Sequence, residues 1–286
     1  VMMFKTFPRV QKLRWYSTAL MREIDPSLDV GALRKIESNK VDVSIARKQH
    51  DQLRSALQNI GLNVVTLPSK GFADSVFIED ICIIIKNTAL ITCPGAKSRR
   101  GEIEAVNTYM RGLHAFTIHN VVEPDATIDG GDVLFTGTEI FVGISERTNK
   151  KGIQKLSECF PNYPVIPINL QQLAKENNIV EIPLHLKSFC SMCGENDILV
   201  GGLIGKGFKN WLEKERKGFY TIIDVPDEAA ANCIYIKNGI VLRRANQEFP
   251  KSETVLNHLN VKKNIQIEAS ELAKVDGALT CCVVLF

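Results

Sequence analysis

The chain of 286 residues is 45% hydrophobic and 23% charged, with a formal net charge of only +3 at pH 7. These proportions are those of a globular protein with an ample core. The small net charge gives no indication of a nucleic-acid or anionic-membrane partner. No apolar run approaches the roughly 18 residues that span a bilayer.

The first 16 residues are basic. Lys5, Arg9, Lys12 and Arg14 precede the first acid of the chain, Glu23, as in mitochondrial transit peptides. We interpret residues 1–16 as a tail that leads into one domain, 17–286. Most of the eight cysteines lie in apolar segments, which favours reduced thiols inside the cell. We therefore expect a cytoplasmic protein, with a mitochondrial location as the alternative.

Short hairpins and helices are predicted in turn along the rest of the chain. A strand at 17–22 precedes a helix that begins after Asp42 and runs to Ile60, where Gly61 ends it. Further helices are expected after Ser98, over about 149–159 and 206–217, and after Ser252. Apolar runs broken by short polar turns predict hairpins at 81–92, 132–145, 188–202 and 232–244. Residues 279–286 have the pattern of half a hairpin.

These hairpins start roughly 50 residues apart, a period typical of repeat architectures. If the strand at 17–22 completes the half hairpin at 279–286, five units close into a ring. The sequence therefore predicts an α/β fold, a five-bladed pseudo-symmetric αβ propeller formed by a single domain. Function is then expected near the axis, where several repeats can contribute polar residues to one pocket.

Two stretches place carboxylates beside apolar strands. Asp74, Glu79 and Asp80 lie in "ADSVFIEDICIII", and Asp129 and Asp132 surround the paired glycines of "ATIDGGDVLF". Buried carboxylates are costly unless a cation accompanies them, so a binding site is one interpretation. The alternative is a pair of turns whose acids lie in water.

A third stretch, "IPLHLKSFCSMCG", places His185 between two leucines. It is either a catalytic imidazole or a core histidine with satisfied hydrogen bonds. The same stretch contains Cys190 and Cys193 with the spacing of a redox or zinc pair, but no second ligand pair accompanies them.

The chain ends in "DGALTCCVVLF", with Cys281 and Cys282 adjacent. On a predicted strand, neighbouring side chains point to opposite faces, so only one thiol can face a given pocket. Both faces are apolar, and alternation does not decide which. A thiol, an imidazole, an acid to orient it and acids to hold a cation are together the parts for nucleophilic attack on a guanidinium group.

Six longer stretches carry a resemblance to a known family. In order along the chain they are "DSVFIEDICII", "TALITCPGAKSRR", "ATIDGGDVLFTGTEIFVGISERTN", "HLKSFCSM", "VPDEAAANCIY" and "SELAKVDGALTCCVVL". In these stretches the chain resembles the dimethylarginine dimethylaminohydrolases, which are guanidino-group-modifying enzymes of the pentein fold. The resemblance implies a five-bladed αβ propeller. It also implies hydrolysis of asymmetric dimethyl- or monomethyl-L-arginine to L-citrulline and a methylamine, through a covalent thiouronium intermediate on a cysteine.

The resemblance implies a role for each motif residue. Cys281 would be the nucleophile, His185 the general acid and base, and Asp129 the residue that orients His185. The implied substrate contacts are Glu79 and Asp80 to the guanidinium, Asp74 to the α-amino group, Arg99 and Arg147 to the α-carboxylate, and main-chain atoms of Leu33 and Val275.

No cofactor or metal is expected to be required, although zinc could bind Cys281 and His185 and inhibit. The expected partner is a small molecule, a methylated L-arginine, with neither nucleic acid nor membrane involved. A monomer is expected, with a homodimer as the alternative. The rival functions are an arginine deiminase and a non-catalytic propeller that binds arginine derivatives or a protein.

Overall fold

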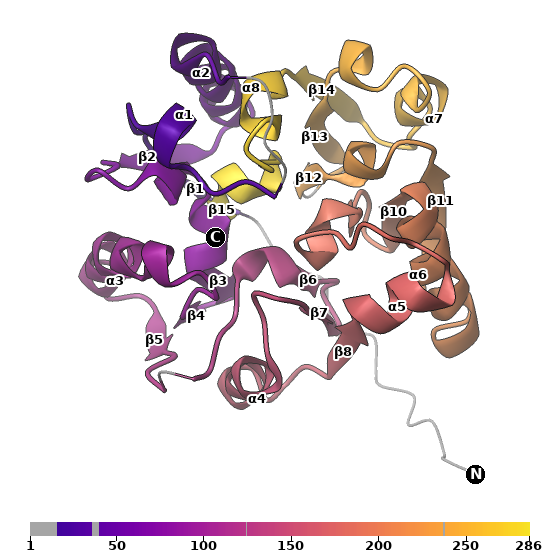
Figure 1. Ribbon diagram of the computed structural model, residues 1–286, viewed down its shortest axis with the longest axis horizontal. Coiled ribbons are helices and arrows are strands. Elements are labelled where there is room, and N and C mark those ends of the chain that lie inside the picture. The colour runs from indigo at the N-terminus through magenta and orange to yellow at the C-terminus, as the bar shows by residue number, and fades with distance from the viewer. Residues whose placement is uncertain (1–15, 36–39, 124, 237) are drawn as a thin grey trace.

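Each predicted hairpin forms the antiparallel half of a three-stranded sheet in the computed structural model, which describes residues 16–35, 40–123, 125–236 and 238–286. The five sheets surround a central axis as the blades of a propeller, with the longer helices at the periphery (Figure 1). The sheets are β15 (Val284–Leu285), β1 (Thr18–Arg22) and β2 (Asn63–Leu67); β3 (Cys82–Ile85), β4 (Thr88–Ile91) and β5 (Thr117–Asn120); β6 (Val133–Phe135), β7 (Ile140–Ile144) and β8 (Val165–Asn169); β9 (Cys190–Met192), β10 (Asp197–Gly201) and β11 (Thr221–Val225); and β12 (Cys233–Ile236), β13 (Ile240–Arg244) and β14 (Lys263–Ile267).

The third strand of each blade was not predicted. It runs parallel to the second strand, and a helix connects the two, as a parallel pair requires. These outer strands are short and only partly buried; β5, for example, is "TIHN". A strand of this kind shows neither the long apolar run nor the clean alternation that marks a strand in a sequence.

The predicted helices are present at the expected positions along the chain, but some of them begin or end at other residues than predicted. Asp42 begins α2 (Val43–Asn59) by accepting the backbone N–H groups of Ser44 and Ile45, which confirms the predicted cap. Ser98 does not cap α3 (Ile103–Gly112), because residues 97–102 form a 3₁₀ helix. The remaining helices are α1 (Leu28–Gly31), α4 (Lys150–Cys159), α5 (Leu170–Glu176), α6 (Gly202–Glu215), α7 (Glu253–Asn257) and α8 (Ser270–Ala273). Of these, α1, α5 and α8 were not predicted.

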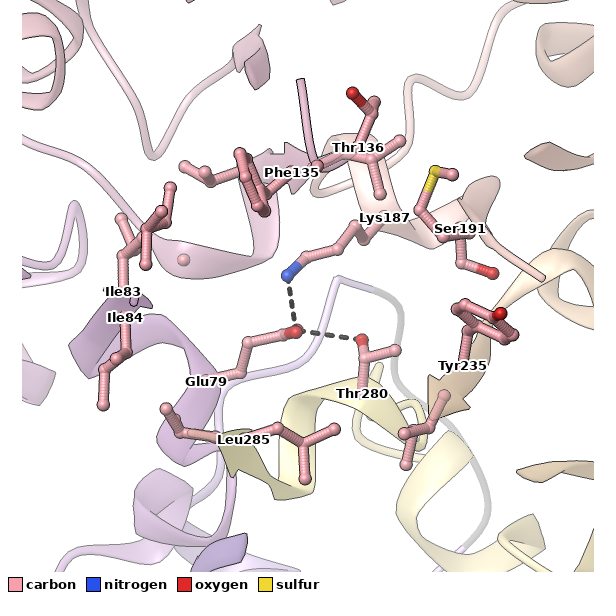
Figure 2. A pocket seen from close by; sticks show the side chains of 18 of the residues that line it. Glu79, Ile83, Ile84, Phe135, Thr136, Lys187, Ser191, Tyr235, Thr280 and Leu285 are labelled. Atoms are coloured by element: carbon pink, nitrogen blue, oxygen red, sulfur yellow. Dashed lines mark hydrogen bonds and ion pairs between the residues drawn. The ribbon is translucent and has the colours of Figure 1, made fainter. Parts of the chain in front are cut away.

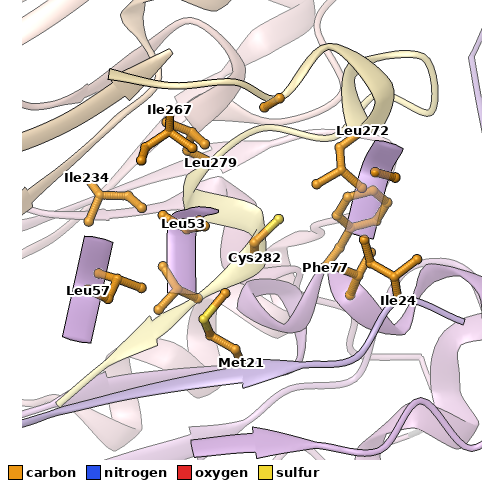
Figure 3. Close-up of a cluster of buried hydrophobic side chains, with 14 of the residues drawn as sticks. Met21, Ile24, Leu53, Leu57, Phe77, Ile234, Ile267, Leu272, Leu279 and Cys282 are labelled. Carbon is orange, nitrogen blue, oxygen red and sulfur yellow. The ribbon is translucent and has the colours of Figure 1, made fainter. Parts of the chain in front are cut away.

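The two ends of the described chain close the ring. β15 pairs with β1 in antiparallel register, with Ala19 opposite Leu285, as predicted. The largest apolar cluster lies behind this junction and holds Cys282 together with Met21 and Leu53 (Figure 3). Among the described helices, none is both long and apolar enough to cross a membrane. The predicted basic tail lies almost wholly outside the described residues.

Candidate active site

Short 3₁₀ helices precede the first strand of each blade and meet near the axis. Four of them carry the residues of interest: η2 (Ile78–Ile81), η4 (Gly130–Asp132), η5 (Leu186–Ser188) and η8 (Thr280–Cys282). Two pockets that share no lining residue lie against these segments. We call them the loop pocket, of about 230 Å³, and the strand pocket, of about 290 Å³. The loop pocket is lined by Leu33, Arg34, Lys35, Asp74, Phe77, Asp80, Arg99, Asp129, Glu146, Arg147, Leu184, His185, Val275, Asp276 and Cys281.

The loop pocket brings together every residue that the sequence analysis singled out for catalysis or substrate binding, except Glu79. These residues come from four different blades and from the loop after β1, so no single repeat could form the site. Asp80, Asp129, His185 and Cys281 lie in or directly before the 3₁₀ helices that precede the first strands of four blades.

His185 and Asp129 form a buried pair. The distance from His185 Nε2 to Asp129 Oδ2 is 3.0 Å, and the other oxygen of Asp129 accepts the backbone N–H of Gly95 at 2.8 Å. Burial opposes the imidazolium, but Asp80, the hydrogen bond that the ring donates to Asp129 and the nearby Asp132 outweigh it and raise the pKa of His185 to about 9. At neutral pH His185 is therefore a cation that can donate a proton.

The paired glycines of "IDGGD" allow the surrounding segments to pack this closely. A Cβ atom on Gly131 would lie 2.7 Å from His185 Nδ1 and 2.9 Å from Asp80 Oδ1, and one on Gly130 would lie 1.9 Å from the carbonyl oxygen of Glu79. Only glycine fits at either position. The neighbours that approach these glycines are the η2 segment and the imidazole ring of His185.

Cys281 and Cys282 lie in η8, which is a 3₁₀ helix and not the strand that the sequence predicted. The thiol of Cys281 is half-buried in the loop pocket, whereas Cys282 is fully buried in the apolar cluster behind it. Burial, together with Glu79 and Asp80, raises the pKa of Cys281 well above its usual value. Cys281 is therefore a neutral thiol when no cation occupies the pocket.

Asp80 lines the loop pocket and is held by two donors. Arg99 Nη1 donates to Asp80 Oδ2 at 2.6 Å, and Gly131 N donates to Asp80 Oδ1 at 2.9 Å. Burial raises its pKa, but His185 and Arg99 outweigh this effect and hold the pKa of Asp80 below its usual range. Asp80 is thus an anion at neutral pH.

Arg99 uses most of its donors inside the protein. Beyond Asp80, its guanidinium bonds both carboxylate oxygens of Glu102 and the carbonyls of Asp74 and Phe77. Of five N–H groups, one on Nη1 is left for a ligand. Arg99 lines the pocket, but its main contacts hold Asp80 and the backbone of η1 (Ala73–Val76) and η2 in place.

The same pocket also contains groups suited to the amino-acid end of a ligand. Asp74 accepts the backbone N–H of Leu33 at 3.0 Å, which ties the loop after α1 to the pocket. Burial raises the pKa of Asp74, and Arg99 opposes that shift. Arg147 and Val275 also line the loop pocket, and no described residue makes a hydrogen bond or ion pair with the guanidinium of Arg147.

Glu79, the exception, lines the strand pocket, and its contact with the substrate guanidinium stays a prediction. Its carboxylate contacts the ammonium of Lys187 and accepts the hydroxyl of Thr280 at 2.9 Å (Figure 2). Apolar side chains such as Ile83, Phe135 and Leu285 surround this polar floor. Lys187 was not predicted, because a lysine two residues after His185 has no pattern that marks it as buried.

Three groups of the loop pocket could hold a cation. One ligand atom from each of Asp80, Asp129 and His185 lies within 4.8 Å of the others. Carboxylate and imidazole ligands suit zinc. The predicted zinc pair, Cys281 and His185, lines the same pocket. Cys190 and Cys193 are buried in or beside β9, and burial raises the pKa of both thiols.

Comparisons with known proteins agree with this geometry. The family model described as "N,N dimethylarginine dimethylhydrolase, eukaryotic" matches residues 31–284. The chain is 32% identical over 264 residues to the N(G),N(G)-dimethylarginine dimethylaminohydrolase of Streptomyces coelicolor, covering 92% of this chain and 94% of that protein. It is 28% identical over 262 residues to the enzyme of the same name from Pseudomonas aeruginosa, covering 90% and 94%. A solved cysteine-to-serine mutant of a Pseudomonas aeruginosa DDAH in complex with citrulline superposes with a TM-score of 0.81 at 26% identity, covering 96% of this chain and 100% of that one.

Proposed function

Because this chain belongs to the dimethylarginine dimethylaminohydrolase family, we propose that it hydrolyses asymmetric dimethyl- and monomethyl-L-arginine to L-citrulline and a methylamine. The observation that carries the proposal is one pocket that contains a thiol, a protonated imidazole and a buried carboxylate anion. These are the groups needed to bind a guanidinium and to attack its central carbon.

Substrate binding assigns one end of the ligand to each side of the pocket. Asp80, an anion at neutral pH, receives the guanidinium through charge-assisted hydrogen bonds. The guanidinium of Arg147 can bind the α-carboxylate through two N–H groups, and Arg99 adds its one remaining N–H. Asp74 and the main chain near Leu33 and Val275 receive the α-amino end.

The bound cation prepares the nucleophile. Without ligand, Asp80 and Glu79 disfavour a negative charge on the Cys281 sulfur. A guanidinium next to the thiol reverses that balance, so the thiol loses its proton to water and the thiolate forms on substrate binding. The enclosed pocket then holds sulfur and carbon together, an approximation worth about 7 kcal/mol in favourable cases.

Chemistry then proceeds in two stages. The Cys281 thiolate forms a C–S bond to the guanidinium carbon. The His185 imidazolium donates its proton to the methylated nitrogen, and the C–N bond breaks to release the amine. The thiouronium remains on Cys281. Neutral His185 next takes one proton from water, and the resulting hydroxide forms a C–O bond. The C–S bond then breaks, the Cys281 sulfur takes up the remaining hydroxyl proton, and citrulline leaves. Asp129 orients His185 and stabilises its cation throughout.

Citrulline release from a panel of arginines tests the proposal. Asymmetric dimethylarginine and monomethylarginine should yield stoichiometric citrulline and the matching amine. Faster release from unmethylated arginine would point to a deiminase. If none of these compounds yields citrulline but calorimetry shows that they bind, the protein is a non-catalytic binding propeller instead.

A further inference from the structure

Three contacts between blades follow one pattern around the axis. A polar side chain next to the first strand of one blade accepts a backbone N–H from the 3₁₀ helix of the next blade. Asp80 accepts from Gly131 at 2.9 Å, Asp132 from Leu186 at 2.9 Å, and Asn232 from Thr280 at 3.1 Å. The segments that donate the N–H in these pairs are those that carry Asp129, His185 and Cys281. Each proposed catalytic residue is therefore fixed from the preceding blade.

Asn232 is the member of this set that has no part in the chemistry derived above. It lies between η6 (Glu228–Ala231) and β12 and is 1% exposed. Besides accepting the Thr280 N–H, its amide nitrogen donates to the Lys187 carbonyl at 3.0 Å and to the Thr280 hydroxyl at 2.9 Å. One side chain thus bonds the residue before Cys281 and the second residue after His185.

We propose that Asn232 is a positioning residue that sets the distance between the Cys281 and His185 segments. The proposal rests on the proposed function, because it assigns the nucleophile to Cys281 and the acid to His185. Asn232 reaches no ligand, since it does not line the loop pocket. Its effect is exerted through the backbones of η8 and η5.

The amide is the side chain that suits this position. It must accept one bond and donate two, and an aspartate would offer only acceptors. An aspartate would also place a second carboxylate on Thr280, whose hydroxyl already donates to Glu79 at 2.9 Å. Burial raises the pKa of Glu79 despite its contact with Lys187, so further negative charge nearby is unfavourable. The two acidic members of the set, Asp80 and Asp132, instead lie close to His185.

The test compares Asn232→Ala with Asn264→Ala in the full-length protein. Asn264 lies on β14, in the sheet whose first strand follows Asn232. Its side chain accepts a bond from Arg243 Nε and donates one to the Leu256 carbonyl, both at 2.7 Å. Both variants should lose stability. Asn232→Ala should lower kcat at least about tenfold while KM changes less than about threefold, because nucleophile and acid no longer align. Asn264→Ala should keep kcat.

A second, isosteric variant keeps the test decisive if Asn232→Ala does not fold. Asn232→Asp keeps the acceptor for the Thr280 N–H and removes both donors, and kcat should again fall about tenfold. A folded Asn232 variant with a normal kcat, or a kcat loss of equal size in Asn264→Ala, would overturn the proposal.

The rate at which 2-chloroacetamidine labels Cys281 separates this proposal from the proposed function. The labelling rate measures the reactivity of the Cys281 thiol and does not require that the enzyme turn over a substrate. If the wild-type protein is labelled at Cys281 but releases no citrulline, the function fails. The positioning role is then still decided by whether Asn232→Ala slows labelling relative to Asn264→Ala. Equal labelling rates would contradict it.

Discussion

The two pockets against the central 3₁₀ helices are built from neighbouring residues and yet have opposite characters. Asp80 faces the loop pocket and Glu79 the strand pocket; His185 faces the first and Lys187 the second; Cys281 faces the first and Thr280 the second. In the strand pocket the acid and the base contact each other, and the hydroxyl bonds the acid. In the loop pocket Arg99 holds the acid and Asp129 holds the imidazolium, and the thiol of Cys281 lines the same pocket.

This difference shows that having reactive residue types near the axis does not make an active site. An ion pair whose members satisfy each other stabilises the junction of blades and offers little to a ligand. A carboxylate held by Arg99 from behind keeps oxygen lone pairs free toward the pocket. The predictions below test this division between the two sides, in order of decreasing effect.

Replacing the nucleophile should have the largest effect. Cys281→Ser should abolish citrulline release, because a serine hydroxyl is a far weaker nucleophile without strong base activation, while circular dichroism remains native. Its neighbour is the matched control. Cys282→Ser should keep kcat and lose about 1 kcal/mol of unfolding free energy, because a hydroxyl would be buried in an apolar cluster. If the Cys281→Ser protein is active, Cys281 is not the nucleophile and that role passes to Cys282.

Asp129→Asn should come next, with kcat reduced about 10²- to 10⁴-fold in a folded protein. The amide cannot stabilise the His185 cation and would favour a different tautomer. Stopped assays with asymmetric dimethylarginine at saturating concentration measure this. A kcat within about threefold of wild type would remove Asp129 from the mechanism.

Asp80→Asn and Glu79→Gln compare the two sides directly. Asp80→Asn should lower kcat/KM by two orders of magnitude or more, through loss of the guanidinium partner. Glu79→Gln should instead lower the free energy of unfolding by about 3 kcal/mol, since Lys187 would be left buried without its partner. In Glu79→Gln, kcat/KM of the folded fraction should stay within about tenfold. Equal catalytic losses in both variants would mean that Glu79 also acts on the substrate.

The pH profile should show the high pKa of His185. Because the imidazolium donates the proton, kcat/KM should fall about tenfold for each pH unit above about 9. The same shift contributes to stability. The folded pKa exceeds the unfolded value of about 6.5, so this contribution is complete below that pH and is lost as pH rises through about 9. In Asp129→Asn, the fall of kcat/KM at high pH should begin at a lower pH. If it begins at the same pH as in the wild type, the fall is caused by a group other than His185.

Arg147→Lys should have the smallest effect of the five, a KM raised about tenfold with kcat nearly unchanged. A planar α-carboxylate binds the guanidinium fork in two places, and an ammonium cannot reproduce this. An exposed lysine-to-arginine change, Lys214→Arg on the outside of α6, serves as a charge-conserving control. If KM stays the same in Arg147→Lys, Arg147 does not bind the carboxylate.

The sequence predicted the repeats of this fold better than their outer parts. Hairpins such as 232–244 carry an Asn-Gly turn between apolar runs, and that local chemistry specifies the pairing. Outer strands such as β14 owe their form to the parallel neighbour already in place, which no local pattern records. The closure of β1 on β15 was predictable because an apolar half hairpin needs a partner.

The site was predictable as a set of residue types, and its division between two pockets was not. Glu79 and Asp80 are adjacent, and only the 3₁₀ conformation of η2 decides which pocket each one faces. The same holds for Cys281 and Cys282, where the predicted strand was wrong even though Cys282 is buried as expected. Asn232 could not be singled out, because a lone asparagine before a strand is common in turns.

The most direct test of the division is the position at which an electrophilic amidine reacts. The full-length protein is treated with 2-chloroacetamidine, digested, and mapped by mass spectrometry, with and without asymmetric dimethylarginine. We predict one label, on Cys281, with activity lost in proportion and with protection by the substrate. A label on Cys282, or labelling of Cys281 that substrate does not slow, would contradict the assignment of the loop pocket as the active site.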